Sequence, residues 1–173
     1  EFIQLVVDAT TSPGYCNTMG TATTMNSLAE GLGMSLPGCA AIPAPLSARG
    51  EMSYRTGLRI VEMVKEDLTP SKIMTRQAFE NSVVLNSAIG GSTNAPIHIN
   101  AIARHVGVKL EIAEWQKLGL EIPLLVNMQP TGKYLGEDFH RAGGVPAVMN
   151  ALLKAGKLHD SALTVNGKTV AEN

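Results

Sequence analysis

Apolar side chains recur at helical spacing along most of the chain, and glycine, proline and small polar residues interrupt the repeats. The first strong repeat consists of Met25, Leu28 and Leu32, which follow several residues able to cap a helix. Gly31 and Gly33 are expected to end this helix, because glycine readily adopts the left-handed conformation found at helix ends.

The middle of the chain predicts a longer helix over residues 51–66. We expect Ile60, Met63 and Val64 to form its buried side, since they lie three and four positions apart. Further helices are expected wherever a cap or a tight turn precedes an apolar repeat. They cover residues 75–87 with Thr75 as the cap, the repeat from the turn at 89–94 to Val106, residues 112–118, and residues 143–154.

A few segments have strand character instead. Residues 122–126 are the best strand candidate in the middle of the chain, whereas the opening run 2–7 fits either a helix or a strand. Near the end, short β-prone runs flank Asn166 and Gly167. An Asn-Gly pair is a strong signal for a β-hairpin, because both central residues of the favoured turn require positive φ.

Together these elements predict an α/β fold in which helices dominate. We expect a three-layer α/β segment with a few strands and a C-terminal β-hairpin. The 173 residues have the length of one domain. Residues 1–160 are expected to form this domain, and residues 161–173 to form the hairpin at its edge or to link it to a further domain.

Charge and composition narrow the classes of function. With 14 basic and 15 acidic residues the formal net charge is −1, which gives no field to attract nucleic acid or an anionic membrane. No run approaches the roughly 18–20 apolar residues of a membrane span, and residues 1–7 lack the basic region of a signal peptide. Two cysteines are too few for a secreted disulfide scaffold, so we expect a cytoplasmic protein.

Cys16 has the most favourable setting for chemistry. It lies between a Pro-Gly turn and a helix start, where backbone N–H groups and the helix dipole stabilise a thiolate. That setting suits a metal or cluster ligand or a nucleophile, while a small buried hydrophobic residue is the other interpretation. Cys39 lies in a proline-rich loop among apolar neighbours, so we expect it to have a structural role.

The other polar motifs are less specific. Residues 89–94, Ile-Gly-Gly-Ser-Thr-Asn, could hold an anion at a helix start or simply cap the helix. No two of the four histidines lie three or four positions apart, so no zinc site is expected. His98 is expected to be a satisfied core histidine. Glu137 and Asp138 are adjacent in sequence, which does not make them a catalytic carboxylate pair.

The run Cys-Asn-Thr-Met-Gly-Thr-Ala that begins at Cys16 resembles the dihydroxy-acid and phosphogluconate dehydratase family. Within that family, this run and residues 123–130 look most like the pentonate (xylonate or arabonate) dehydratases. The resemblance covers nearly the whole chain through blocks that keep their order. Besides the run at Cys16, these blocks are 32–38, 41–44, 75–81, 90–94 with His98, 130–134, 142–146 and 167–169.

The resemblance implies a hydro-lyase that converts a sugar acid of the D-xylonate or L-arabonate class to a 2-keto-3-deoxy acid. Such enzymes bind an iron–sulfur cluster, [2Fe-2S] or possibly [4Fe-4S], through three cysteines, and Mg²⁺ binds the carboxylate end of the substrate. Cys16 matches the last of these cysteines and is the one ligand that carries over. Residues 1–160 would be part of the N-terminal iron–sulfur catalytic domain of a homodimer or homotetramer that binds a small-molecule substrate.

Several family motifs do not occur in these residues. They are the Cys-Asp-Lys motif, the first cluster cysteine and the Thr-Asp-Gly-Arg segment. We therefore expect the chain alone to be inactive and a full-length parent to be the dehydratase. Two alternatives are a dihydroxy-acid dehydratase of branched-chain amino acid biosynthesis and a non-catalytic scaffold or assembly module.

Overall fold

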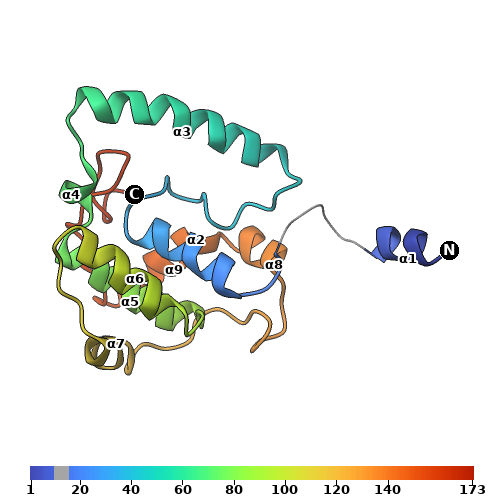
Figure 1. Cartoon of the computed structure of the whole chain (residues 1–173). Coiled ribbons are helices and arrows are strands. Elements are labelled where there is room, and N and C mark those ends of the chain that lie inside the picture. Colours follow the sequence, from blue (N-terminus) through green and yellow to red (C-terminus); the bar gives the residue numbers. More distant parts are fainter. Residues whose placement is uncertain (10–15) are drawn as a thin grey trace.

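The computed structural model describes residues 1–9 and 16–173, which form a helical body with a long helix lying across it (Figure 1). The helices predicted from caps and glycines are present, and their ends lie close to the expected positions. Two short helices, α4 and α8, were not predicted. The elements are α1 (Phe2–Ala9), α2 (Thr21–Gly31), α3 (Ser47–Lys65), α4 (Pro70–Ile73), α5 (Arg76–Ile89), α6 (Ala95–His105), α7 (Ile112–Gly119), α8 (Gly136–Arg141) and α9 (Gly144–Lys154).

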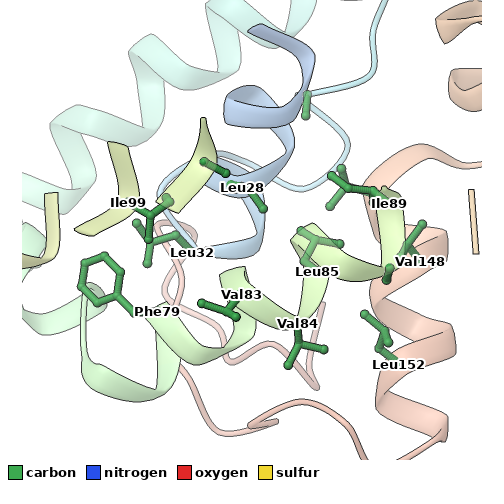
Figure 2. Close-up of a cluster of buried hydrophobic side chains, with 14 of the residues drawn as sticks. Leu28, Leu32, Phe79, Val83, Val84, Leu85, Ile89, Ile99, Val148 and Leu152 are labelled. Carbon is green, nitrogen blue, oxygen red and sulfur yellow. The ribbon is translucent and has the colours of Figure 1, made fainter. Parts of the chain in front are cut away.

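Helix α5 is the centre of the hydrophobic core. It packs against α2, α6, α7 and α9, so apolar side chains leave it in several directions (Figure 2). Phe79, Val83 and Leu85 have no exposed surface. Burying such side chains contributes about 1.5–3 kcal/mol each relative to leaving them in water. The core therefore holds α2, the helix into which the segment with Cys16 leads.

Helix α3 lies over a second, smaller cluster and is far less buried than predicted. Met52 and Met63 are its buried residues, and they pack on a cluster that includes Ile73. Ile60 and Val64, expected on the buried side, are 53% and 76% exposed. The prediction of the buried side is therefore wrong for these two residues. Apolar side chains occupy more than one side of α3, so their spacing alone does not identify the side that faces the body.

The opening run, which fits either a helix or a strand by its sequence, lies in helix α1. This helix buries none of its residues, and it lies away from the other helices (Figure 1). No helix in the described part of the chain combines the length and the apolar character needed to cross a bilayer.

The expected α/β class is not confirmed, and the described residues form a mostly α structure. Among the described residues, the expected strand at 122–126 has no partner strand, and the Leu125 N–H donates to the Ala88 carbonyl at the end of α5. Outside the helices, the described residues contain two isolated β-bridges, Met128 with Tyr134 and Leu163 with Thr169. A ladder needs consecutive pairs, and single bridges form neither strands nor the third layer.

The C-terminal segment turns at the predicted place but forms no strands. The Thr164 N–H donates to the Lys168 carbonyl (2.9 Å), and Gly167 has a φ of 82°. Asn166 does not have positive φ, so the turn is not of the expected kind. The Val165 N–H donates to the Gly33 carbonyl after α2 instead of extending a hairpin. The segment is thus attached to the helical body.

Candidate functional site

Cys16 is exposed and lies in the segment that leads into α2. Hydrogen bonds with the backbone of Thr18, then with its side chain, lower the pKa of the Cys16 thiol, which outweighs the effect of its partial burial. A weaker hydrogen bond with the Thr23 side chain acts in the same direction. The sulfur lies 3.8 Å from the Thr18 hydroxyl. A thiolate is the form that binds metals and attacks electrophiles, so this arrangement favours reactive chemistry.

The segment around Cys16 is attached to a distant part of the chain. The Gly136 N–H donates to the Asn17 carbonyl (2.8 Å), and the Glu137 N–H donates to Asn17 Oδ1 (3.1 Å). Asn17 thereby satisfies two N–H groups at the start of α8, which otherwise lack partners within the helix. The buried Met19 donates its N–H to the Gln129 carbonyl (2.7 Å). These contacts anchor the residues that directly follow Cys16.

A cavity of about 230 Å³ opens beside Cys16. Helix α2 contributes Thr23 and Asn26, the loop after α2 contributes its apolar residues 40–42, and α8 contributes Phe139. Arg49, from the first turn of α3, also lines the cavity. The cavity therefore combines a cysteine, a cation and neutral polar groups.

Glu30 holds the loop that forms one wall of this cavity. It is only 6% exposed, and its carboxylate accepts the N–H groups of Gly38 (2.6 Å) and Ala40 (2.8 Å). Burial raises the pKa of Glu30, although these two hydrogen bonds act in the opposite direction. Sequence reasoning missed this residue, because an acidic side chain within a helix gives no local sign that it is buried.

Arg49 of α3 contacts Cys39 and Ile42 in the loop after α2. The Arg49 guanidinium donates to the Ile42 carbonyl and lies 3.6 Å from the Cys39 sulfur. Cys39 is half-buried and packs against the smaller core cluster, which agrees with its expected structural role. Arg49 was not singled out from the sequence, since its neighbours along the chain give no indication that it lines a cavity together with Cys16.

The Gly-Gly turn at 89–94 binds to the first turns of α2. The Ser92 N–H donates to Thr24 Oγ1 (3.0 Å), and Asn94 Nδ2 donates to Thr21 Oγ1 (2.9 Å). A side chain at Gly91 would meet Asn86 Oδ1 at 2.1 Å, so any larger residue there would force the Asn86 side chain to move. These contacts attach the turn to α2. Asn94, the residue before α6, makes no side-chain cap hydrogen bond, so the capping interpretation is not confirmed.

The histidine and carboxylate predictions have mixed outcomes. His98 is exposed, so the expectation that it is a core histidine is wrong; it lies on the outer side of α6. Glu137 and Asp138 act separately in α8: Asp138 accepts the Leu135 N–H (3.1 Å), while Glu137 lies 3.7 Å from Arg141. They form no catalytic carboxylate pair.

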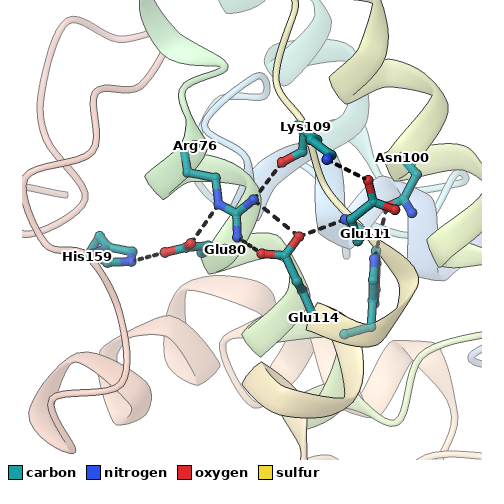
Figure 3. A network of polar contacts seen from close by, with 8 residues as sticks. Arg76, Glu80, Asn100, Lys109, Glu111, Glu114 and His159 are labelled. Atoms are coloured by element: carbon teal, nitrogen blue, oxygen red, sulfur yellow. Dashed lines mark hydrogen bonds and ion pairs between the residues drawn. The ribbon is translucent and has the colours of Figure 1, made fainter.

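A second polar region, the Arg76 network, joins α5 to α7 (Figure 3). Arg76 binds Glu80 (2.7 Å) and Glu114, and it donates to the Lys109 carbonyl (2.6 Å). His159 Nε2 lies 2.6 Å from Glu80 Oε2. None of these residues lines the cavity at Cys16. The network connects structural elements and contributes nothing to the candidate site.

The described residues contain no group of three or more His, Cys, Asp or Glu side chains that could hold a metal ion. Cys16 is exposed and its pKa is lowered, so it fits as one thiolate ligand of a metal or cluster. The remaining ligands would have to come from outside the described residues.

Comparison with known proteins gives consistent matches along the chain. The sequence model described as Dihydroxy-acid/6-phosphogluconate dehydratase N-terminal matches residues 1–173. A D-xylonate dehydratase from Caulobacter vibrioides is 58% identical over all of this chain and 29% of its own length. An L-arabinonate dehydratase from Rhizobium leguminosarum bv. trifolii is 55% identical over 98% of this chain, again 29% of its own length.

A dihydroxy-acid dehydratase from Caldanaerobacter subterraneus subsp. tengcongensis is 46% identical over the whole chain and 31% of its own length. The chain thus spans less than a third of the length of each of these relatives. The matched region includes the run at Cys16, the turn at 89–94 and all residues that line the cavity. The chain belongs to the dihydroxy-acid/6-phosphogluconate dehydratase family, in the region that its N-terminal model describes.

Proposed function

We propose that the chain is part of a hydro-lyase that dehydrates a sugar acid, and that Cys16 is one thiolate ligand of its iron–sulfur cluster. The observation that carries the proposal is the setting of Cys16. The thiol is exposed, its pKa is lowered, and it lies beside a cavity in a segment fixed by Asn17. A packed structural thiol has no need of these features.

The cluster, proposed as [2Fe-2S] with [4Fe-4S] as the alternative, would supply a Lewis-acidic iron that polarises the departing hydroxyl of the substrate. The residues of this chain would hold the cluster and keep the cavity beside it in shape. Cys16 provides the ligand, Asn17 fixes its position, and Glu30 holds the opposite wall. No carboxylate group in the described residues is arranged for Mg²⁺, so we propose that the Mg²⁺ ligands lie elsewhere in the full-length protein.

The substrate is proposed to be a five-carbon sugar acid of the xylonate or arabonate class. Identity to relatives named for those two substrates is 58% and 55%, compared with 46% for the dihydroxy-acid dehydratase. The last relative nevertheless matches the whole chain, and this supports a branched-chain dihydroxy acid as the second candidate substrate.

We also propose that the protein is a homodimer or homotetramer. Tyr54, Leu58 and Val61 lie on one side of α3 and are 52–68% exposed. Exposed apolar residues that gather on one side of a helix are typical of surfaces that another subunit or domain covers.

The proposal is tested by iron and acid-labile sulfide analysis with visible spectroscopy. The full-length protein is reconstituted anaerobically as wild type, as Cys16→Ser and as the matched control Cys39→Ser. We expect the wild type and the Cys39 variant to bind the cluster. We expect Cys16→Ser to lose both the cluster and the dehydration of D-xylonate or L-arabonate.

A Cys16→Ser variant that keeps its full iron content and spectrum would show that the thiol is merely packed. A wild type that binds no iron and dehydrates neither sugar acids nor dihydroxy acids would support a non-catalytic scaffold instead.

A further inference from the structure

Helix α3 presents a line of exposed residues on the side that faces away from the helical body (Figure 1). Met52 and Met63 mark the side that packs on the smaller core cluster. Val61 lies nine positions after Met52, and Tyr54 lies nine positions before Met63. Nine positions are about two and a half turns, so Tyr54 and Val61 lie on the opposite side of the helix. They are 68% and 54% exposed.

This exposed side has the repeat of a helix that packs along another helix. Its positions are separated by alternating steps of four and three residues, the repeat found where two α-helices lie side by side. We call these five exposed residues the α3 seam: Gly50, Tyr54, Gly57, Val61 and Val64. No other described element covers the seam, so a helix that packs on it would come from outside the described chain.

The two glycines of the seam indicate that such a helix approaches closely. A Cβ at Gly50 or Gly57 would meet no atom of another described element within 4 Å. Glycine within a helix is less stable than alanine, because it loses more conformational freedom on folding. Packing within the described chain therefore explains neither glycine. A glycine lets a neighbouring backbone come close, and a larger side chain opposite it fills the space.

The charges beside the seam identify the partner. Glu51 and Lys65 lie on one flank of the seam, with Leu58 midway between them, and all three are exposed. Neither charged residue forms an ion pair with another described residue. A copy of the same helix that runs in the opposite direction brings Glu51 to the partner's Lys65, and Leu58 to the partner's Leu58. Farther out, Arg55 and Glu62 follow the same order and meet in the same way.

A parallel pair of helices would leave these charges without partners. In that arrangement the flank with Glu51 and Lys65 faces the other flank of the second helix, where the uncharged Ser53 and Ile60 lie. The seam also fits the antiparallel direction, because Tyr54 then lies opposite the partner's Val61 and Gly57 lies near the centre of the contact.

We propose that α3 packs antiparallel against α3 of a second copy of the chain. The same surface of both copies forms this contact, with the two-fold axis beside Leu58. This inference rests on the proposed oligomer and deepens it, since it assigns the contact surface and the direction of its helices. The flanking charges fix that direction and contribute little to stability.

The test uses analytical ultracentrifugation of the full-length protein, which gives the size of the oligomer and its dissociation constant. Val61→Glu places a carboxylate in the seam. The matched control Ile112→Glu places one at an exposed apolar residue of α7. Circular dichroism checks that each variant is folded, and iron analysis is carried out on the same samples.

We expect Val61→Glu to raise the dissociation constant at least about 100-fold, because its carboxylate would be buried in the contact without a partner. A dimer would then become monomers, or a tetramer dimers. The variant should stay folded, since Val61 is exposed within the chain. Ile112→Glu should match the wild type.

The direction of the two helices is tested by exchanging charges. Glu51→Lys and Lys65→Glu should each raise the dissociation constant about 3- to 10-fold, because each places like charges opposite one another. The double variant should return to within about 2-fold of the wild type, since the exchange restores opposite charges.

An unchanged dissociation constant in Val61→Glu, or a monomeric wild type, would overturn the inference and leave the seam to another segment of the full-length protein. A double charge variant that associates more weakly than either single variant would also overturn it, because the helices would then not run antiparallel. If Val61→Glu does not fold, the charge variants decide the question. The association result stands on its own: a wild type that binds no iron but loses association in Val61→Glu refutes the proposed function and keeps the inference.

Discussion

The Arg76 network and the cavity at Cys16 differ in how completely their charges are paired. Arg76 has two carboxylate partners and a backbone carbonyl, and Glu80 adds a contact with His159. At the cavity, Arg49 faces no carboxylate, and Glu30 is held by N–H groups instead of a cation. Fully paired charges connect helices and have no capacity left for a ligand. Incompletely paired charges keep that capacity.

The largest expected effect comes from the wall of the cavity. Glu30→Ala leaves the part-buried N–H of Gly38 and the buried N–H of Ala40 without an acceptor, and each buried loss costs about 1–3 kcal/mol. We expect the free energy of unfolding to fall by about 3 kcal/mol. We also expect the loop to move and to change the shape of the cavity wall that it forms. Urea denaturation measures the first effect, and iron content of the full-length protein measures the second.

The matched control is Glu51→Ala, which removes an exposed carboxylate from α3. It should change stability by less than about 0.5 kcal/mol. Equal stabilities of the Glu30 and Glu51 variants would show that the buried carboxylate does not hold the loop.

A smaller effect is expected from Arg76→Met, which leaves Glu80 and Glu114 without their cation. Because the Arg76 side chain is 40% exposed, solvent screens the lost interactions, and we expect a loss of about 1 kcal/mol. Iron content should not change, since the network does not line the cavity. Thermal unfolding of Arg76→Met, compared with that of the exposed control Arg104→Met, measures the loss of stability. Any loss of iron in Arg76→Met would show that the Arg76 network and the cavity at Cys16 are not independent.

The smallest effects should be seen in the pH dependence of stability. A rise in pH should increase the contribution of Glu114 in the Arg76 network and decrease that of Glu30 beside the cavity. The bond with Arg76, then that with the Glu111 N–H, lowers the pKa of Glu114 to about 2. Its contribution is complete above about pH 4.5 and is lost as the pH falls toward about 2. Burial raises the pKa of Glu30, so its contribution is complete below about pH 4.5 and is lost as the pH rises through the raised pKa.

Denaturation curves recorded across this pH range separate the two carboxylates. Glu114→Gln should flatten the acid side of the stability profile, and Glu30→Gln should flatten the side above pH 4.5. Identical slopes in both variants would mean that neither carboxylate titrates as its surroundings indicate.

The helices were predictable because their signals are local. Thr75 caps α5 by accepting the Ala78 N–H (3.4 Å), as its position before an apolar repeat indicated. Gly90 ends the same helix with a φ of 63°. A cap and a left-handed glycine depend on residues within one turn, so the sequence contains all of the information needed.

Strands and helix sides were not predictable in the same way, because they depend on distant partners. Residues 122–126 have strand propensity, but Leu125 meets the carbonyl end of α5 and no second strand. Ile60 was expected to face the body and faces solvent, since α3 has apolar residues on more than one side. His98 is exposed for a related reason: an apolar sequence context does not determine which side of α6 faces the core.

The candidate site was predicted only in part for the same reason. Cys16 could be singled out from the Pro-Gly pair, which lies outside the described residues, and from the expected helix start beside it. Arg49 and Glu30 could not, because their roles arise when α2, the loop after it and α3 come together around one cavity.

The two tethers of the cavity, Asn17 and Glu30, lie just before α2 and near its end. The length of α2 therefore sets the distance between the segment with Cys16 and the loop that Glu30 holds, because an α-helix is stiff. A ligand that enters meets a preorganised cavity, since the ordering entropy of both segments is lost during folding and not during binding. Binding in such a cavity should therefore depend mainly on the shape and charge of its walls.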